Sequence, residues 1–193
     1  MNTHTSTGTQ VEHTDIRTLA TGVLGQMFSS PKSTLHKSYE STWKTWMERR
    51  HDKAFSIREI WVKFALRTLE SHPELSEPLS AALKEKLMDP DDKIRGTVVQ
   101  GMGNLDSIGL AHVSDEVLKV VGERCKDKKP SVRQKAIVAM GKIWNSLVGE
   151  MFVVFSEKIA GMSHKKQNSH TFAGSRAKTL LRSRSMAGSL VLF

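Results

Sequence analysis

The chain has 193 residues, of which 38% are hydrophobic and 25% charged, and its formal net charge at pH 7 is +9. This length and composition suit about one domain with tails and exclude disorder of the whole chain. A single cysteine, Cys125, excludes an internal disulfide framework, and no apolar run exceeds five residues, far fewer than the roughly 20 of a membrane-spanning helix, so no membrane partner is expected.

Both ends of the chain lack a helical or strand pattern. Residues 1–13 are polar and threonine-rich, and residues 149–193 form a serine-rich tail that has no acidic residue after Glu157. Such compositions are typical of disordered segments, so we predict disorder at both ends. The tail also leaves open one alternative function, nucleic-acid binding, because lysines and arginines without acidic neighbours attract phosphates.

Between these ends one motif recurs three times without gaps. It reads Glu, a base, two variable residues, Asp, four variable residues, then Ile or Val followed by Arg. Arg17 ends a fourth, degenerate copy, and successive arginines are 41, 37 and 38 residues apart. These spacings indicate that the chain contains a repeat of about 40 residues. The acids and bases of the three full copies are Asp52, Arg58, Asp89, Arg95, Asp127 and Arg133.

Apolar residues recur at helical spacing before each of these aspartates and after each arginine. Each copy is therefore predicted to be a helical hairpin, in units around 14–29, 38–71, 75–106 and 114–147. The predicted fold is all-α, an α-α superhelix of the HEAT or armadillo type with about four helical hairpins over residues 14–148. Ala20, Leu24 and Met27 are expected to face the core in the first unit, and Trp43 and Trp46 in the second.

The repeated aspartates and arginines have a structural explanation. An Asp in the turn can accept hydrogen bonds from unpaired amides at the start of the next helix, and its charge suits the positive end of the helix dipole. The Arg six residues later can bridge to the Asp of its own or of the neighbouring unit. Repeated along the stack, these pairs would form an Asp–Arg ladder that sets the register between hairpins.

Four ordered segments carry a more specific resemblance. They are Ile16–Phe28, Thr42–Arg49, Leu87–Arg95 and Gly122–Arg133. Their sequence, order and spacing resemble the cohesin-associated regulators of sister-chromatid cohesion named for precocious dissociation of sisters, most of all the fungal members. The resemblance extends from about Thr14 to Trp144. Because family members are much longer, we expect this chain to be a fragment of such a solenoid.

Members of that family are HEAT-repeat solenoids without catalytic activity. The resemblance therefore implies a non-enzymatic regulator that binds the kleisin subunit of cohesin on chromatin in the nucleus, with effects on the cell cycle, mitosis, cell division and DNA repair. It also implies a release factor and the cohesin acetyltransferase as partners, and inositol polyphosphate as a ligand. A generic HEAT-repeat scaffold of another complex, such as a transport receptor or a phosphatase scaffold, remains an alternative.

Basic residues near the turns are expected to form a ridge, because the turns between paired helices lie along one edge of a solenoid. Such a ridge could contact an acidic partner segment, DNA phosphates or a polyphosphate, or it could be only a solvated edge. Its members are Arg49, Arg50, Lys53, Lys93, Arg124, Lys126, Lys128 and Lys129.

The remaining motifs predict little chemistry. Ser30, followed by Pro31, is a candidate site of proline-directed phosphorylation. The eight histidines form no His-Glu dipeptide and no His-Glu-x-x-His motif, so no metal site, cofactor or catalytic residue is predicted. Gly101 and Gly103 lack the Lys-Ser/Thr of a phosphate loop and are expected to allow close helix packing instead.

Overall fold

The computed structural model describes residues 13–163, with the side chains of residues 13–149. Within this range it contains nine α-helices, three short 3-10 helices and no strand, which confirms the predicted all-α fold. The elements are α1 (Thr14–Phe28), α2 (Leu35–Ser38), α3 (Glu40–Glu48), η1 (Arg49–His51), α4 (Phe55–Ser71), η2 (Pro73–Leu75), α5 (Ser76–Lys86), α6 (Asp92–Met102), α7 (Ser107–Ala111), α8 (Asp115–Glu123), η3 (Arg124–Lys126) and α9 (Pro130–Ser163).

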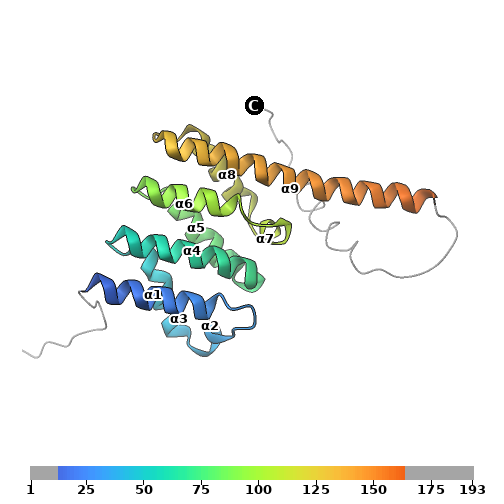
Figure 1. Ribbon diagram of the computed structural model, residues 1–193. Helices are drawn as coiled ribbons and strands as arrows, with labels where there is room; N and C mark the ends of the chain where they lie inside the picture. The colour runs from blue at the N-terminus through green and yellow to red at the C-terminus, as the bar shows by residue number, and fades with distance from the viewer. Residues whose placement is uncertain (1–12, 164–193) are drawn as a thin grey trace, which may run out of the picture.

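The helices stack in two layers (Figure 1). In one layer α1 packs on α4, α4 on α6 and α6 on α9, whereas α3, α5 and α8 form the other layer, in which α5 packs on α8. Three helical hairpins result, α3 with α4, α5 with α6, and α8 with α9, and α1 precedes them as the second helix of a further unit. The turns inside the hairpins lie at one edge of the stack, here called the turn edge, and the connections between units lie at the opposite edge.

Tryptophans form the centre of the core near the N-terminal units. Trp46 is 1% exposed and Trp43 is 9% exposed, which confirms that both belong to the core. Their rings stack with centroids 5.2 Å apart, and Phe28 meets Trp43 edge-on at 5.0 Å. The Trp46 indole nitrogen donates a hydrogen bond to the carbonyl oxygen of Thr21 at 3.0 Å, so its polar atom is paired.

The core-facing prediction for α1 is confirmed for Leu24, which packs against the core, and is wrong for Ala20 and Met27. Ala20 and Met27 are exposed and Leu24 is only half-buried, and the buried face instead contains Arg17 and Phe28. The physical reason is that α1 is the first helix of its layer. In the described part of the chain, its only neighbour within that layer is α4, so the opposite side of α1 is left uncovered. An exposed apolar stripe remains on its other side, formed by Ile16, Leu19, Val23 and Met27.

One boundary also differs from the sequence prediction. Helix α9 continues to Ser163, past the predicted end of the repeats at residue 148, because residues 149–163 contain no proline to interrupt it. In the connection between α6 and α8, the short helix α7 contains Gly109, whose amide donates a hydrogen bond to the Asp106 carboxylate at 2.7 Å. The disorder predicted for 1–12 and 164–193 concerns residues outside those described.

Among the helices that the structure describes, we find none with the length and hydropathy needed to cross a lipid bilayer.

Candidate functional site

Each turn at the turn edge is built around its aspartate. The carboxylates of Asp52, Asp89 and Asp127 accept hydrogen bonds from the backbone amide two residues later, at 3.0, 3.0 and 2.9 Å. These amides lie just before the first turns of α4, α6 and α9, where backbone donors have no partner inside the helix. Each of these aspartates therefore lies between two helices, and its side chain caps the start of the second one.

The arginines join neighbouring units. Arg17 Nε and Nη2 donate to both oxygens of Asp52 at 3.0 and 3.2 Å. In the same way Arg58 donates to Asp89 at 3.1 and 3.1 Å, and Arg95 to Asp127 at 2.8 and 2.8 Å. Each side-chain pair thus links an arginine to the aspartate of the next unit, which is one of the two pairings that the spacing allows.

The same arginines also hold their own turns. Nη1 of Arg58 donates to the carbonyl oxygen of Asp52 at 2.8 Å, and Nη1 of Arg95 to that of Asp89 at 2.8 Å. Arg133 makes the equivalent bond to the carbonyl of Asp127 at 2.9 Å, but among the described residues it bonds no carboxylate. The sequence pattern missed the pair that Arg17 makes, because the aspartate of its own copy is absent and its partner belongs to the next unit.

A second base contacts each aspartate from three residues before it. Arg49 lies 3.6 Å from Asp52, and Arg124 lies 3.3 Å from Asp127. Lys86 lies 3.2 Å from Asp89 and is itself buried. In the sequence, the base that follows Glu in every copy of the motif could have indicated this second contact to the aspartate. Two members of the predicted ridge, Arg49 and Arg124, are therefore directed at turn aspartates.

These contacts keep the turn carboxylates ionised. The pKa of Asp127 falls from 3.8 to about 2, chiefly because Arg95 donates hydrogen bonds to the charged form, although burial acts in the opposite direction. Burial raises the pKa of Asp52 and Asp89, but hydrogen bonds outweigh it and the pKa of each lies below its ordinary value. The donors are Arg17 and the Ala54 amide for Asp52, and the Asp91 amide, Arg58 and Lys86 for Asp89.

Acid is therefore expected to destabilise the fold through Asp127. Because the pKa is lower in the folded state, the stabilisation is complete above the ordinary value of 3.8 and is lost as the pH falls toward 2. The loss from this group is about 2 kcal/mol in the free energy of unfolding, measured by urea titration between pH 6 and pH 2. The Asp127→Asn variant should have a flatter pH profile over this window, and a profile parallel to that of the parent chain would contradict the assignment.

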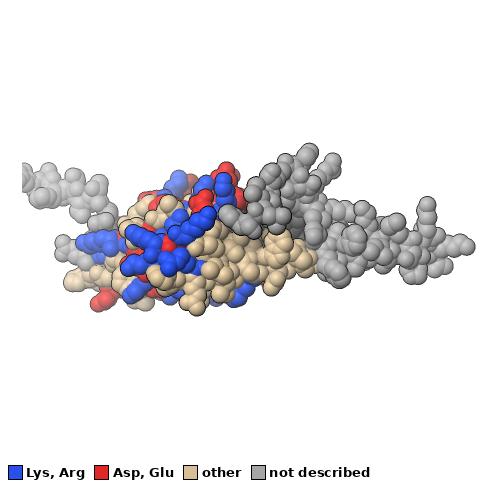
Figure 2. Space-filling model, turned by 90° about the horizontal axis from the view of Figure 1, so that it is seen from above, with Lys and Arg blue, Asp and Glu red and all other residues tan. Residues whose placement is uncertain are grey.

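Five lysines of the predicted ridge remain exposed on the turn edge. Figure 2 shows Lys and Arg gathered at the left of the described surface, with Asp and Glu among them, next to the tan surface of other residues. The partly buried Arg50 is bound to Glu85 at 3.2 Å and to the Met47 carbonyl at 2.7 Å, and the Lys93 ammonium lies 5.0 Å from the centre of the Phe55 ring. The exposed part of the predicted ridge is here called the lysine row. It consists of Lys53, Lys93, Lys126, Lys128 and Lys129.

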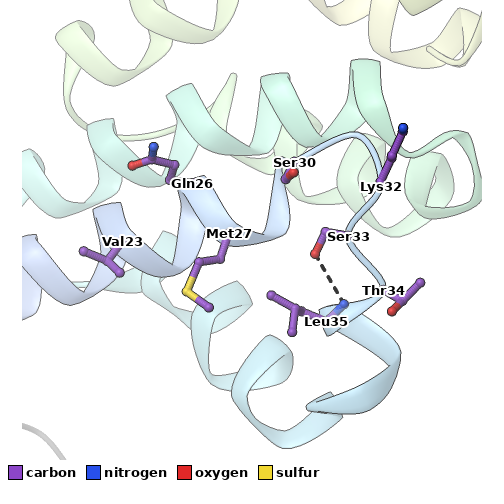
Figure 3. Close-up of a pocket in the computed structure, with 8 residues that line it drawn as sticks. All are labelled: Val23, Gln26, Met27, Ser30, Lys32, Ser33, Thr34 and Leu35. Atoms are coloured by element: carbon purple, nitrogen blue, oxygen red, sulfur yellow. Dashed lines mark hydrogen bonds between the residues drawn. The ribbon is translucent and has the colours of Figure 1, made fainter.

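Ser30 lies on an open hollow at the opposite edge, where α1 ends (Figure 3). Its side chain is exposed, and Lys32 and Ser33 from the following loop also line the hollow. On the other side the apolar chains of Val23 and Met27 come from α1. Phosphorylation of Ser30 remains a prediction. In the structure Ser30 is exposed at the rim of this hollow.

The chain resembles several known proteins. It matches the family model described as "Sister chromatid cohesion protein PDS5 protein" over residues 6–173. The Sister chromatid cohesion protein PDS5 homolog A of Homo sapiens is 30% identical over 145 residues, which cover 74% of this chain. The PDS5 homolog B-A of Xenopus laevis is 31% identical over 122 residues, which cover 63% of this chain.

A solved structure, described as "Structure of the Pds5-Scc1 complex and implications for cohesin function", superposes with a TM-score of 0.61. At 18% identity it covers 89% of this chain and 24% of that chain, and the likeness shows the fold. This chain spans only a small part of its relatives, 11% of the Homo sapiens protein and 8% of the Xenopus laevis protein. The family match covers most of the chain and extends past both ends of the resemblance found in the sequence. The chain belongs to the family of sister chromatid cohesion proteins PDS5.

Proposed function

We propose that this chain is part of a non-enzymatic regulator of sister chromatid cohesion and contacts the kleisin subunit of cohesin through its HEAT-repeat surface. Membership of the PDS5 family carries the proposal. The likeness to a solved Pds5–Scc1 complex supports it. The place of action would be chromatin in the nucleus, and the release factor and the cohesin acetyltransferase would be further partners of the whole protein.

The lysine row is the surface that we propose for an acidic segment of the partner. Its members follow the turns of successive units, so their spacing suits an extended chain better than a compact surface. None of them is a member of the Asp–Arg ladder, so a partner that contacts them leaves the ladder intact. Charge complementarity of this kind sets the rate and specificity of association and weakens with salt.

A binding experiment tests this function. The immobilised 193-residue chain is expected to retain the purified kleisin subunit at low salt. The Lys128→Glu/Lys129→Glu variant should retain about tenfold less, because a rim charge reversal replaces attraction with repulsion. A matched control is Lys37→Glu/Lys119→Glu, which reverses two exposed lysines away from the turns and should bind like the parent chain.

Two outcomes would contradict this proposal in different ways. Failure of the parent chain to retain the kleisin subunit would remove the function itself. Equal retention by both double variants would leave the kleisin contact but move it away from the lysine row. Immunoprecipitation that yields transport cargo or a phosphatase catalytic subunit, without cohesin, would favour the generic scaffold.

The lysine row also favours a second candidate, an inositol polyphosphate ligand. Lys128 and Lys129 are adjacent and exposed in one turn, and Lys126 precedes them. Several ammonium groups within a short segment suit a ligand with several phosphates. Competition by inositol polyphosphate for kleisin binding to the parent chain would place both ligands on the same surface.

A further inference from the structure

A cluster of titratable side chains lies at the edge opposite the turns, where two inter-unit connections meet. His36 comes from α2, His72 from the end of α4 and Glu74 from η2. One nitrogen or oxygen atom from each of the three lies within 4.8 Å of the others. Both histidines are buried, at 7% and 3% exposure, whereas the Glu74 side chain is about half exposed.

His72 is oriented by the backbone. Its Nε2 lies 2.8 Å from the carbonyl oxygen of Ser30, so this nitrogen carries the hydrogen and donates it. In a neutral ring the other nitrogen, Nδ1, then bears a lone pair, and it faces Oε1 of Glu74 at 3.2 Å. Two electron-rich atoms at this distance need a positive charge with them, either a proton on Nδ1 or a metal ion. Metal-binding histidines are commonly held by such a bond from the second ring nitrogen to a carbonyl.

His36 supplies a second imidazole, which has no hydrogen-bond partner among the described residues. Both of its ring nitrogens are buried, and neither makes a hydrogen bond within the described part of the chain. Its Nε2 points toward Oε1 of Glu74 at 3.7 Å, and its ring meets that of His72 edge-on with centroids 5.5 Å apart. Unpaired buried nitrogens are rare and call for a ligand.

The spacing of these atoms suits zinc. Zinc binds histidine nitrogen and carboxylate oxygen at about 2.0–2.2 Å, so neighbouring ligand atoms of a tetrahedral site lie about 3.4 Å apart. The two separations from Glu74, 3.2 Å to His72 and 3.7 Å to His36, bracket that value. Imidazole donors disfavour magnesium and calcium. We propose that His36, His72 and Glu74 bind Zn²⁺, with water as the fourth ligand at the exposed side of Glu74.

Such an ion would add a further link between two connections that the chain already joins by hydrogen bonds. The connection that contains α2 leads from the first unit to the second, and the one that contains η2 leads from the second unit to the third. They already touch where the Ser71 hydroxyl donates to the Ser29 carbonyl at 3.0 Å. Zinc bound only by the folded chain would stabilise it by mass action, so its thermal midpoint should rise with the zinc concentration.

Metal titration of the full chain, first stripped with a chelator, tests the proposal. We expect Zn²⁺ to bind with one-to-one stoichiometry by calorimetry, and Co²⁺ to give the visible absorption of a tetrahedral site. Glu74→Gln should weaken zinc binding at least about tenfold and remove the thermal shift, since it replaces a charged ligand with a neutral amide. Because Glu74 is half exposed, this variant is expected to fold. His36→Gln should act in the same direction.

His112→Gln is the matched control, because it removes a histidine elsewhere in the fold and leaves the cluster intact. It should bind zinc like the parent chain. Zinc binding and a thermal shift that survive unchanged in Glu74→Gln and His36→Gln would reveal attachment to other histidines and overturn the proposal. Absence of zinc binding by the parent chain would overturn it equally.

Discussion

Replacing Arg95 with methionine is expected to lower the free energy of unfolding by about 3–5 kcal/mol, the largest effect of any single change in the Asp–Arg ladder. Arg95 and Asp127 are 3% and 5% exposed, and two hydrogen bonds of 2.8 Å join them. Methionine retains much of the apolar stem but removes the guanidinium, which leaves a buried carboxylate without its main partner. Urea unfolding followed by circular dichroism measures the loss.

Arg133→Met is the matched control for that change. Arg133 has the same position in its repeat and bonds the backbone carbonyls of its own turn, but its removal leaves no described carboxylate unpaired. Its expected cost is about 1 kcal/mol, the net worth of ordinary hydrogen bonds. Equal losses in Arg95→Met and Arg133→Met would show that the link between units contributes nothing beyond the turn. Combining Arg95→Met with Asp127→Asn should cost less than the sum of the two single changes, because the pair is coupled.

Gly103→Ala should destabilise the chain by about 1–3 kcal/mol through the contact between α6 and α9. A Cβ at Gly103 would lie 2.6 Å from both the Cα and the Cβ of Ala139. The obstacle is backbone, which cannot rotate away, so α9 would have to shift. Close helix packing was predicted for Gly101 and Gly103 and is confirmed, since a Cβ at Gly101 would likewise clash with Leu66.

Gly141→Ala provides the opposite control on the same helix pair. A Cβ at Gly141 would meet nothing within 4 Å, and the residue lies inside α9. Alanine there should stabilise the chain by about 0.5–1 kcal/mol because it restricts the unfolded backbone without a clash. Both variants can be measured in the same urea series. Stabilisation by Gly103→Ala would contradict the packing argument.

The local chemistry of the turns could be predicted from the sequence, but the partners of the charged side chains could not. An aspartate before a helix start has few options, and each one caps the amide two residues later. An arginine side chain is long enough to reach its own turn or the next one, and only the stacking distance between hairpins selects the aspartate of the next unit. The same stacking brings Arg17 to Asp52 and Arg50 to Glu85. Arg49 and Arg124 instead contact the aspartate three residues later in their own turns, and together these contacts reduce the predicted ridge to its lysines.

The sequence alone determined the fold class, the repeat, the tryptophan core and the family resemblance, because helical periodicity and turn chemistry act over a few residues and recur in every copy. Tertiary structure decided which face of α1 is buried, where the charges of the turn edge are directed, and how His36 meets His72 and Glu74. Residues 36 positions apart converge there only because two inter-unit connections lie side by side at one edge of the stack. The spacing of these residues along the chain does not indicate that contact, since the contact depends on the distance between packed units.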